Sequence, residues 1–334
     1  MIVTLTANPS LDRTVTLPGP LVRGGVNRLE HVLTEPGGKG LNVARVLAAA
    51  GTAVTAVLPA AHGDPLLAAI SALDAPSLTT RAVTVGGSAR VNTAVTEPDG
   101  TTTKINEPGA VLSPQAASRV EDALLDVVSS RCAQDPGPHW AVLSGSLPPG
   151  AAADWYARLV RLLHQAAPGL RIAVDTSDAP LAALTAALPD AAPDLIKPNG
   201  EELGQLAGLP ADRATALEQE AGRGALGPVI EAAQTLRSQG VGAVMATLGG
   251  AGAVLVTPAG AWHAAAPAVR VRSTVGAGDS SVAGYLLADV RGGDDAERLR
   301  SAVAHGSAAA ALPGTALPAP DDLPTQEIVV TRLA

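Results

Sequence analysis

Short runs of apolar residues alternate along this chain with longer stretches in which apolar positions recur at helical spacing. Such alternation is typical of βα units, which build a mostly parallel sheet between helices. The short runs predict strands over residues 2–5, 53–58, 140–143, 171–175, 195–197, 241–247, 253–257 and 269–273. The longer stretches predict helices over residues 41–50, 154–166, 280–290 and 295–311, and one that begins near Glu201. The pattern therefore predicts an α/β fold.

Two stretches interrupt this alternation. Residues 13–35 and 82–107 are rich in threonine and valine and show no helical period. The second stretch contains Pro98-Asp99-Gly100, which is a signal for a hairpin turn. We expect both stretches to form a small separate sheet inserted into the α/β body. Residues 211–227 are polar and rich in alanine, and their pattern predicts no definite element.

Length, composition and charge narrow the class of protein. The chain has 334 residues, 47% of them hydrophobic, so it can bury a large core in one α/β unit or two smaller ones. Its net charge is −8, with three tryptophans, two tyrosines and no phenylalanine, which argues against a nucleic-acid-binding protein. A single cysteine excludes an internal disulfide, and the first residues lack a signal-peptide pattern. We therefore expect a cytoplasmic protein.

One uncharged stretch is long enough to cross a membrane. Between Gln239 and Arg270 there is no aspartate, glutamate, lysine or arginine. The same stretch carries six glycines and two prolines, which would interrupt a membrane-spanning helix. It predicts short buried strands separated by turns, and we expect no contact with a membrane.

Lysine and asparagine are rare in this sequence, and they occur together. Only three of the 23 basic residues are lysines, and each lies within three residues of one of the six asparagines. The pairs are Lys39 with Asn42, Lys104 with Asn106, and Lys197 with Asn199. A compact ammonium group beside an amide suits the recognition of phosphates and hydroxyls. Turn-forming asparagines that lie beside lysines by chance are the alternative.

The most informative motif runs from Ser273 to Ser280, with the sequence Ser-Thr-Val-Gly-Ala-Gly-Asp-Ser. A helix start carries unpaired N–H groups, and glycines let a phosphate approach them closely. Asp279 could cap this helix, or it could take the proton from a hydroxyl that attacks a phosphoryl group. We favour the catalytic role. No Walker motif or dinucleotide fingerprint is present, which argues against P-loop kinases and Rossmann dehydrogenases.

Two further segments near the N-terminus suit an anionic or polyhydroxyl ligand. Residues 36–42, Pro-Gly-Gly-Lys-Gly-Leu-Asn, place three glycines around a rare lysine just before a predicted helix. Residues 8–12, Asn-Pro-Ser-Leu-Asp, follow the first predicted strand and are expected to form a turn. Asp12 in that turn could accept hydrogen bonds from sugar hydroxyls, because ligands of parallel sheets bind beyond the carboxyl ends of the strands. Capping of the turn by Asp12 is the alternative.

The predicted hairpin carries a basic residue and an asparagine on each arm. Arg90 and Asn92 share one face of the first arm, and Lys104 and Asn106 share one face of the second. A two-residue loop would put the two pairs on opposite faces, whereas an odd-length loop or a bulge would put them together. We predict the odd-length loop or the bulge, because the pairs would then form a phosphate clamp.

Three weaker motifs complete the set. Asn199 and Glu202, at positions i and i+3, would share one side of a helix start and could order Mg²⁺ with its waters. The glycine-rich segment 247–252 suits contact with a nucleotide, and the loop 144–150 offers serine hydroxyls.

With these motifs in this order, the chain resembles the ribokinase-like sugar kinases of the phosphofructokinase B type over about residues 1–320. The resemblance implies one ribokinase-like domain over residues 1–334, folded as a three-layer α/β/α sandwich with a mostly parallel central sheet. The inserted strands would form a small β-sheet lid, which often makes the contact of a homodimer. The resemblance also implies transfer of the γ-phosphoryl group of ATP, with Mg²⁺, to a hydroxyl of a sugar phosphate.

The resemblance assigns roles residue by residue. It makes Asp279 the base and the backbone N–H groups of Gly276, Ala277 and Gly278 the anion hole. Eight residues would bind the sugar phosphate: Asp12, Gly38, Lys39, Asn42, Arg90, Asn92, Lys104 and Ser146. Six would line the nucleotide side: Lys197, Asn199, Thr247, Gly249, Gly252 and Ser307. Asn199 and Glu202 would order Mg²⁺ through water.

Two features favour one subgroup of these kinases. Lys39 and the segment 103–109 resemble the enzymes that act on fructose 1-phosphate or tagatose 6-phosphate, whereas those acting on fructose 6-phosphate tend to have glycine at the Lys39 position. We expect conversion of D-fructose 1-phosphate and ATP to D-fructose 1,6-bisphosphate and ADP. The other two sugar phosphates remain alternative substrates, and a non-catalytic sugar-phosphate sensor is a more remote one. Ala7, His305 and Ala316 depart from the family pattern, which leaves nucleotide affinity and a monovalent-cation requirement open.

Overall fold

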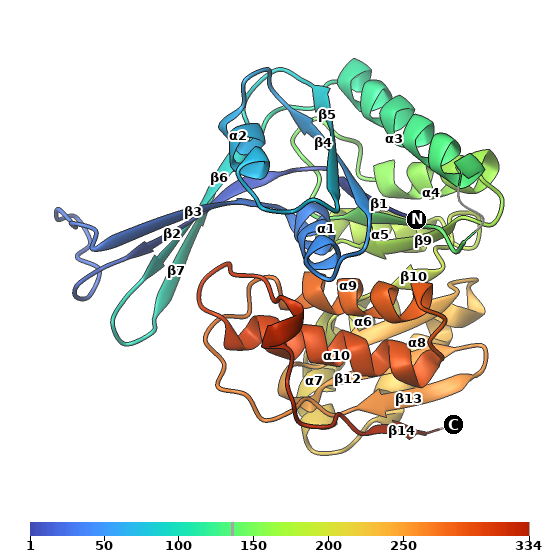
Figure 1. Cartoon of the computed structure of the whole chain (residues 1–334). Coiled ribbons are helices and arrows are strands. Elements are labelled where there is room, and N and C mark those ends of the chain that lie inside the picture. Colours follow the sequence, from blue (N-terminus) through green and yellow to red (C-terminus); the bar gives the residue numbers. More distant parts are fainter. Residues whose placement is uncertain (135–136, 334) are drawn as a thin grey trace.

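The computed structural model describes residues 1–134 and 137–333 and contains a large and a small sheet (Figure 1). In these residues the large sheet has ten strands in the order β14-β13-β12-β11-β10-β9-β8-β1-β4-β5. Their bounds are β1 Ile2–Thr6, β4 Val54–Ala60, β5 Leu78–Thr84, β8 Trp140–Ser144, β9 Arg171–Asp175, β10 Leu195–Ile196, β11 Ala243–Thr247, β12 Ala253–Thr257, β13 Gly260–Ala264 and β14 Val330–Arg332. The strands from β5 to β11 are parallel, and β12, β13 and β14 are added antiparallel. The predicted mostly parallel sheet is confirmed.

Helices cover both faces of the large sheet, because its strands are apolar on both sides. One face packs against α1 Lys39–Ala49, α2 Pro65–Ser71, α9 Ala277–Val290 and α10 Asp295–Ala311. The other packs against α3 Pro114–Gln134, α4 Trp155–Ala166, α5 Asp178–Ala186, α6 Gly200–Leu206, α7 Ala211–Gly222 and α8 Gly227–Ser238. Side chains in β1 alternate between the two cores, with Ile2 in the first and Val3 in the second. The predicted three-layer sandwich is confirmed.

The small sheet projects from the body as a ribbon (Figure 1). Its order is β3-β2-β6-β7, with β2 Ser10–Thr16, β3 His31–Gly37, β6 Arg90–Thr96 and β7 Thr102–Asn106. The two inserted stretches thus supply the small sheet as predicted, although it begins earlier, at Ser10, and residues 82–84 belong to β5 of the large sheet. Thr96 pairs with Thr102 across the hairpin, so the loop 97–101 has an odd length, as predicted.

In the second half of the chain, one predicted strand is absent, one unassigned segment forms a helix, and one predicted set of strands is present. The strand predicted over 269–273 is wrong: the sheet edge beyond β13 is taken by β14, and Arg272 N donates instead to Ala310 O at the end of α10 (2.8 Å). The unassigned segment 211–227 forms α7 and reaches the start of α8. The uncharged stretch forms β11, β12 and β13, as predicted, and no helix in the described residues is long and apolar enough to cross a membrane.

A buried carboxylate fastens the helical layer to the amino-terminal edge of the large sheet. Asp289, on α9, has a side chain that is 1% exposed. It accepts hydrogen bonds from Trp140 Nε1 at 2.7 Å and Arg171 Nη1 at 2.8 Å, and it pairs with Arg298 Nε at 3.0 Å. These partners come from β8, β9 and α10, so one carboxylate joins four elements.

We expect Asp289→Ala to lower the free energy of unfolding by about 2–4 kcal/mol, because it leaves the buried Trp140 Nε1 without an acceptor and two half-buried arginines without their counter-charge. Urea denaturation followed by circular dichroism measures this. Asp126→Ala, at an exposed position of α3, is the control and should change stability by less than about 0.5 kcal/mol. Equal urea midpoints for the two variants would contradict the role of Asp289 in holding these layers together.

Candidate active site

The first turn of α9 carries the carboxylate that the sequence singled out. Gly276 precedes the helix with φ 75°, a left-handed conformation that favours glycine. Asp279 makes no capping hydrogen bond; its Oδ2 instead accepts from Asn42 Nδ2 of α1 at 2.8 Å. Asp279 is therefore not the helix cap, and the capping alternative is wrong.

Close packing of α1 on β1 makes this contact possible. Gly38 precedes α1 with φ 106°, and a Cβ on Gly40 would lie 2.6 Å from Leu5 O. Because no side chain fits there, the start of α1 lies directly on the carboxyl end of β1. This places Lys39 and Asn42 on the edge where α9 also begins, as the sequence predicted for a shared site.

A buried aspartate that the sequence analysis missed connects two of the rare lysines. Asp175 is the last residue of β9 and is 3% exposed. Its Oδ1 lies 3.1 Å from Lys39 Nζ and 3.5 Å from Lys197 Nζ. Strand β9 was predicted, and the position of Asp175 at the carboxyl end of this strand was the one signal that could have identified it as a site residue.

The charges of this cluster shift one another's protonation. Burial, followed by the negative charge of Asp175, raises the pKa of Asp279 to about 6, although Lys39, Asn42 and Lys197 oppose the shift. Burial alone would raise the pKa of Asp175, but Lys197 and Lys39 hold it below its ordinary value. Attraction to Asp175 raises the pKa of Lys39 despite its burial. Asp279 is thus the weakly acidic member of the cluster.

A cavity of about 510 Å³ opens beside the start of α9. Four of the residues predicted for the nucleotide side line it: Thr247, Gly249, Gly252 and Ser307. Ala277 and Gly278 of the predicted anion hole line it as well, and Pro267, Val269 and Val303 add an apolar wall. This volume and this mixture of surfaces suit a nucleotide. His305 is not among the lining residues; its Nδ1 lies 2.8 Å from Ser301 O, in the contact between α10 and α9.

Lys197 links this cavity to the charged cluster. It follows β10 and is 7% exposed, and its Nζ would lie 3.0 Å from a Cβ added to Gly278. Asn199, two residues on, forms a bridge with Thr247 of the glycine-rich segment. The residues predicted for the nucleotide side are therefore gathered around one cavity.

A second polar group lies where the small sheet joins the body. Asp12 accepts hydrogen bonds from Ser10 Oγ at 2.8 Å and from Asn92 Nδ2 at 3.0 Å. The prediction that Asp12 lies in a turn is wrong, because strand β2 already begins at Ser10 and includes Asp12. A Cβ on Gly37 would lie 2.1 Å from Asp12 Oδ2, so glycine is needed on the neighbouring strand.

Several buried polar atoms in this region lack a protein partner among the described residues. They are Arg90 Nε, Asn92 Oδ1 and Ser146 Oγ. Burial lowers the pKa of Arg90, opposed by the charge of Asp12. Because buried polar groups are normally satisfied, these atoms are suited to a polar ligand or to ordered water.

The third lysine lies apart from the other two. Lys104 is exposed on β7 and pairs in register with Ala94, which puts it on the same face as Arg90 and Asn92 but farther out along the small sheet. The structure therefore brings Lys39 and Lys197 together through Asp175, and it leaves Lys104 on the ribbon.

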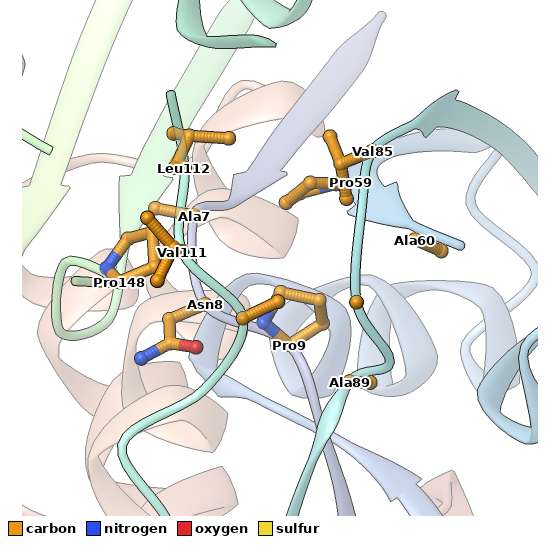
Figure 2. A pocket seen from close by; sticks show the side chains of 12 residues that line it. Ala7, Asn8, Pro9, Pro59, Ala60, Val85, Ala89, Val111, Leu112 and Pro148 are labelled. Atoms are coloured by element: carbon orange, nitrogen blue, oxygen red, sulfur yellow. The ribbon is translucent and has the colours of Figure 1, made fainter. Parts of the chain in front are cut away.

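A small pocket marks the root of the small sheet (Figure 2). Asn8 and Pro9, just after β1, lie there beside Val111 and Pro148. Asn8 Nδ2 donates to Pro108 O at 3.0 Å, and a Cβ on Gly109 would lie 2.2 Å from Asn8 Oδ1. This contact fixes the segment that follows β7 against the end of β1.

The predicted Mg²⁺ residues form a helix cap. Asn199 N donates to Glu202 Oε2 at 2.9 Å, and Glu202 N donates to Asn199 Oδ1 at 2.8 Å. In the described residues no group of three or more histidines, cysteines, aspartates or glutamates gathers for a metal ion. Because the cap uses only one carboxylate oxygen of Glu202, these residues fit an Mg²⁺ held mainly by nucleotide phosphates and water.

A glycine turn at a helix start, a cavity large enough for a nucleotide and a buried carboxylate thus meet at the carboxyl edge of the large sheet. The chain belongs to the pfkB family of carbohydrate kinases, whose profile matches residues 6–322.

Named relatives span nearly the whole chain. The 1-phosphofructokinase of Rhodobacter capsulatus is 37% identical over 333 residues, which cover 99% of this chain and 96% of that protein. The ATP-dependent 6-phosphofructokinase isozyme 2 of Escherichia coli is 33% identical over 98% of this chain and 97% of its own. A crystal structure of phosphofructokinase-2 from Escherichia coli with substrates and products aligns with TM-score 0.80 and 31% identity over 96% of each chain. Structures of that enzyme with potassium and in a tetrameric inhibited form align with TM-scores of 0.80 and 0.79, both at 30% identity and 96% coverage.

Proposed function

We propose that this kinase transfers the γ-phosphoryl group of ATP to the C6 hydroxyl of D-fructose 1-phosphate. The observation that carries the proposal is the position of the Asp279 carboxylate, which is buried next to Ala277 and Gly278 of the nucleotide-sized cavity and hydrogen-bonded to Asn42 at the start of α1. The 1-phosphofructokinase relatives support this substrate. Tagatose 6-phosphate and fructose 6-phosphate are the alternatives, the latter because of the Escherichia coli isozyme.

In this mechanism Asp279 accepts the proton of the attacking hydroxyl. The hydrogen bond from Asn42 orients the carboxylate, and its raised pKa makes it a stronger base than an ordinary aspartate. The N–H groups of Gly276, Ala277 and Gly278 stabilise negative charge on the transferred group. Mg²⁺, ordered through water near Asn199 and Glu202, would neutralise charge on the nucleotide phosphates.

The substrate phosphate is assigned to the base of the small sheet. Arg90 supplies a guanidinium group with a buried unpaired Nε, Lys39 supplies an ammonium group, and Lys104 joins them if the ribbon closes. Closure of the ribbon as a lid would exclude water and limit hydrolysis of ATP.

A monovalent cation is a further candidate cofactor, because a relative has been crystallised with potassium. A cytoplasmic location remains a prediction.

We expect Asp279→Asn to lower kcat by at least about 100-fold, because asparagine cannot accept the proton, while ATP affinity stays close to that of the parent. In the parent enzyme, kcat/KM should be high above pH 6 and fall as the pH drops through about 6, where Asp279 becomes protonated. Steady-state kinetics across pH and calorimetric titration with ATP measure these quantities. Near-normal turnover of the variant would remove Asp279 from its role.

A panel of sugar phosphates tests the substrate. Fructose 1-phosphate should give the highest kcat/KM, and free fructose should be poor. Arg90→Ala should raise the KM for the sugar phosphate by about 10- to 150-fold, because a charge-assisted contact contributes about 1.5–3 kcal/mol. Arg81→Ala, at an exposed position of β5, is the matched control and should leave the KM unchanged. If free fructose reacts as fast as its 1-phosphate, the phosphate clamp is wrong.

We also propose a homodimer formed through the small sheet. Val32 and Ile105 are 50% and 59% exposed and share the face opposite to Asp12 and Asn92. Exposed apolar groups on one face of a projecting sheet suit pairing with a second copy.

Sedimentation at micromolar concentration should give a dimer. Combined Val32→Asp and Ile105→Asp should give a monomer. Val329→Asp, at an exposed apolar position far along the chain from the small sheet, should leave the dimer intact. A monomeric parent protein would refute this assembly.

A further inference from the structure

Asp175 occupies a row of polar residues at the carboxyl edge of the large sheet. Thr6 of β1, Ser144 of β8 and Asp175 of β9 are register partners on adjacent strands. Register partners point to the same face of a sheet, and this face carries α1 and α9. Thr6 Oγ1, Ser144 Oγ and Asp175 Oδ2 are all buried, with no hydrogen-bond partner among the described residues. Buried polar atoms in such a row are suited to ordered water.

The other carboxylate oxygen of Asp175, Oδ1, contacts two lysines that come from different elements of the fold. Lys39 is the first residue of α1 and its Nζ lies 3.1 Å from Oδ1, whereas Lys197 follows β10 and its Nζ lies 3.5 Å from the same atom. Lys39 belongs to the proposed sugar side and Lys197 to the nucleotide side. One carboxylate oxygen therefore joins the two halves of the site.

The same carboxylate also balances charge around Asp279. The charged groups that act on Asp279 are Asp175 from β9, Lys39 from α1 and Lys197 from the segment after β10. Two cations and two carboxylates sum to zero in this cluster, in which Asp175, Asp279 and Lys197 are buried and the Lys39 side chain is 37% exposed. Removal of Asp175 would leave two ammonium groups facing a single carboxylate.

We propose that Asp175 is a positioning residue, which holds the ammonium groups of Lys39 and Lys197 in place for the two substrates and balances their charge beside Asp279. The inference rests on the proposed function, since it assigns each lysine to one substrate. It differs from a purely structural ion pair, because it requires effects on both substrates and on the protonation of Asp279.

Asp175→Asn keeps the shape of the side chain and removes its charge. We expect kcat/KM to fall by about 10- to 150-fold when either ATP or the best sugar phosphate is varied, since each lysine loses a charge-assisted partner. We also expect the acid limb of the pH profile to move to lower pH. The sign follows because Asp279 loses a neighbouring negative charge that raises its pKa and keeps two positive charges that lower it.

Asp289→Asn is the matched control, because Asp289 is also a buried aspartate paired with cations but lies at the opposite edge of the sheet. It should lower thermal stability and leave the acid limb in place. An Asp175→Asn profile with an unchanged acid limb, or an effect on only one substrate, would overturn the proposal.

A second variant covers the case in which Asp175→Asn does not fold. Asp175→Glu keeps the charge but moves the oxygens, so we expect kcat/KM to fall at least about 10-fold for both substrates while the acid limb stays near that of the parent. Full activity of Asp175→Glu would refute positioning. If Asp279→Asn is inactive but both Asp175 variants behave like the parent, only the proposed role of Asp175 is refuted. If Asp279→Asn is active, the proposed role of Asp279 as the base is refuted instead.

Discussion

Two helices must begin at the same point of the sheet edge, and the rest of the site depends on this constraint. The starts of α1 and α9 come close enough for Asn42 to donate to Asp279 at 2.8 Å. Glycines make this approach possible, because a Cβ on Gly40 would strike the backbone of β1 and one on Gly278 would press on Lys197. Both helix starts direct unpaired N–H groups towards the same edge, where a phosphate can bind.

The charges at this edge are arranged around a low-dielectric centre. Asp175 and Asp279 are both buried, and two carboxylates in such a position would repel each other strongly without Lys39 and Lys197. The two lysines stabilise the charge of the two carboxylates to different extents. Asp175 bonds to both ammonium groups and stays ionised, whereas Asp279 has an amide partner and a pKa of about 6. Different surroundings thus give two chemically identical side chains different tasks.

Local patterns in the sequence predicted most of the fold and several of the residues that the structure gathers at one edge of the sheet. Strands such as β1 and β9 and the helix α10 follow from apolar periodicity, and the glycine turn before Asp279 follows from its composition. The failures involve contacts between distant segments. Residues 269–273 read as a strand because valines alternate there, yet β14 occupies the available sheet edge. Asp175 was missed because its role depends on Lys39, which is 136 residues away in the chain.

Asp12 shows the same limit. Its presence near the site was predicted from its position after the first strand, but its conformation was not. The strand pairing that places Asn92 beside it comes from β6, 80 residues along the chain. Periodicity within either segment contains no information about that pairing, so the prediction of a turn was reasonable and wrong.

The connections at the root of the ribbon have a mechanical consequence. Strand β2 starts at Ser10, close after β1 ends at Thr6, and β3 ends at Gly37, with only Gly38 before α1. Glu35 on β3 also binds Arg45 of α1 at 3.0 Å. Such short joints leave little slack between the small sheet and the start of α1, so the position of one constrains the position of the other. Lys39 and Asn42, in the first turns of α1, are thereby coupled through one short joint to the strands that carry Asp12 and Asn92.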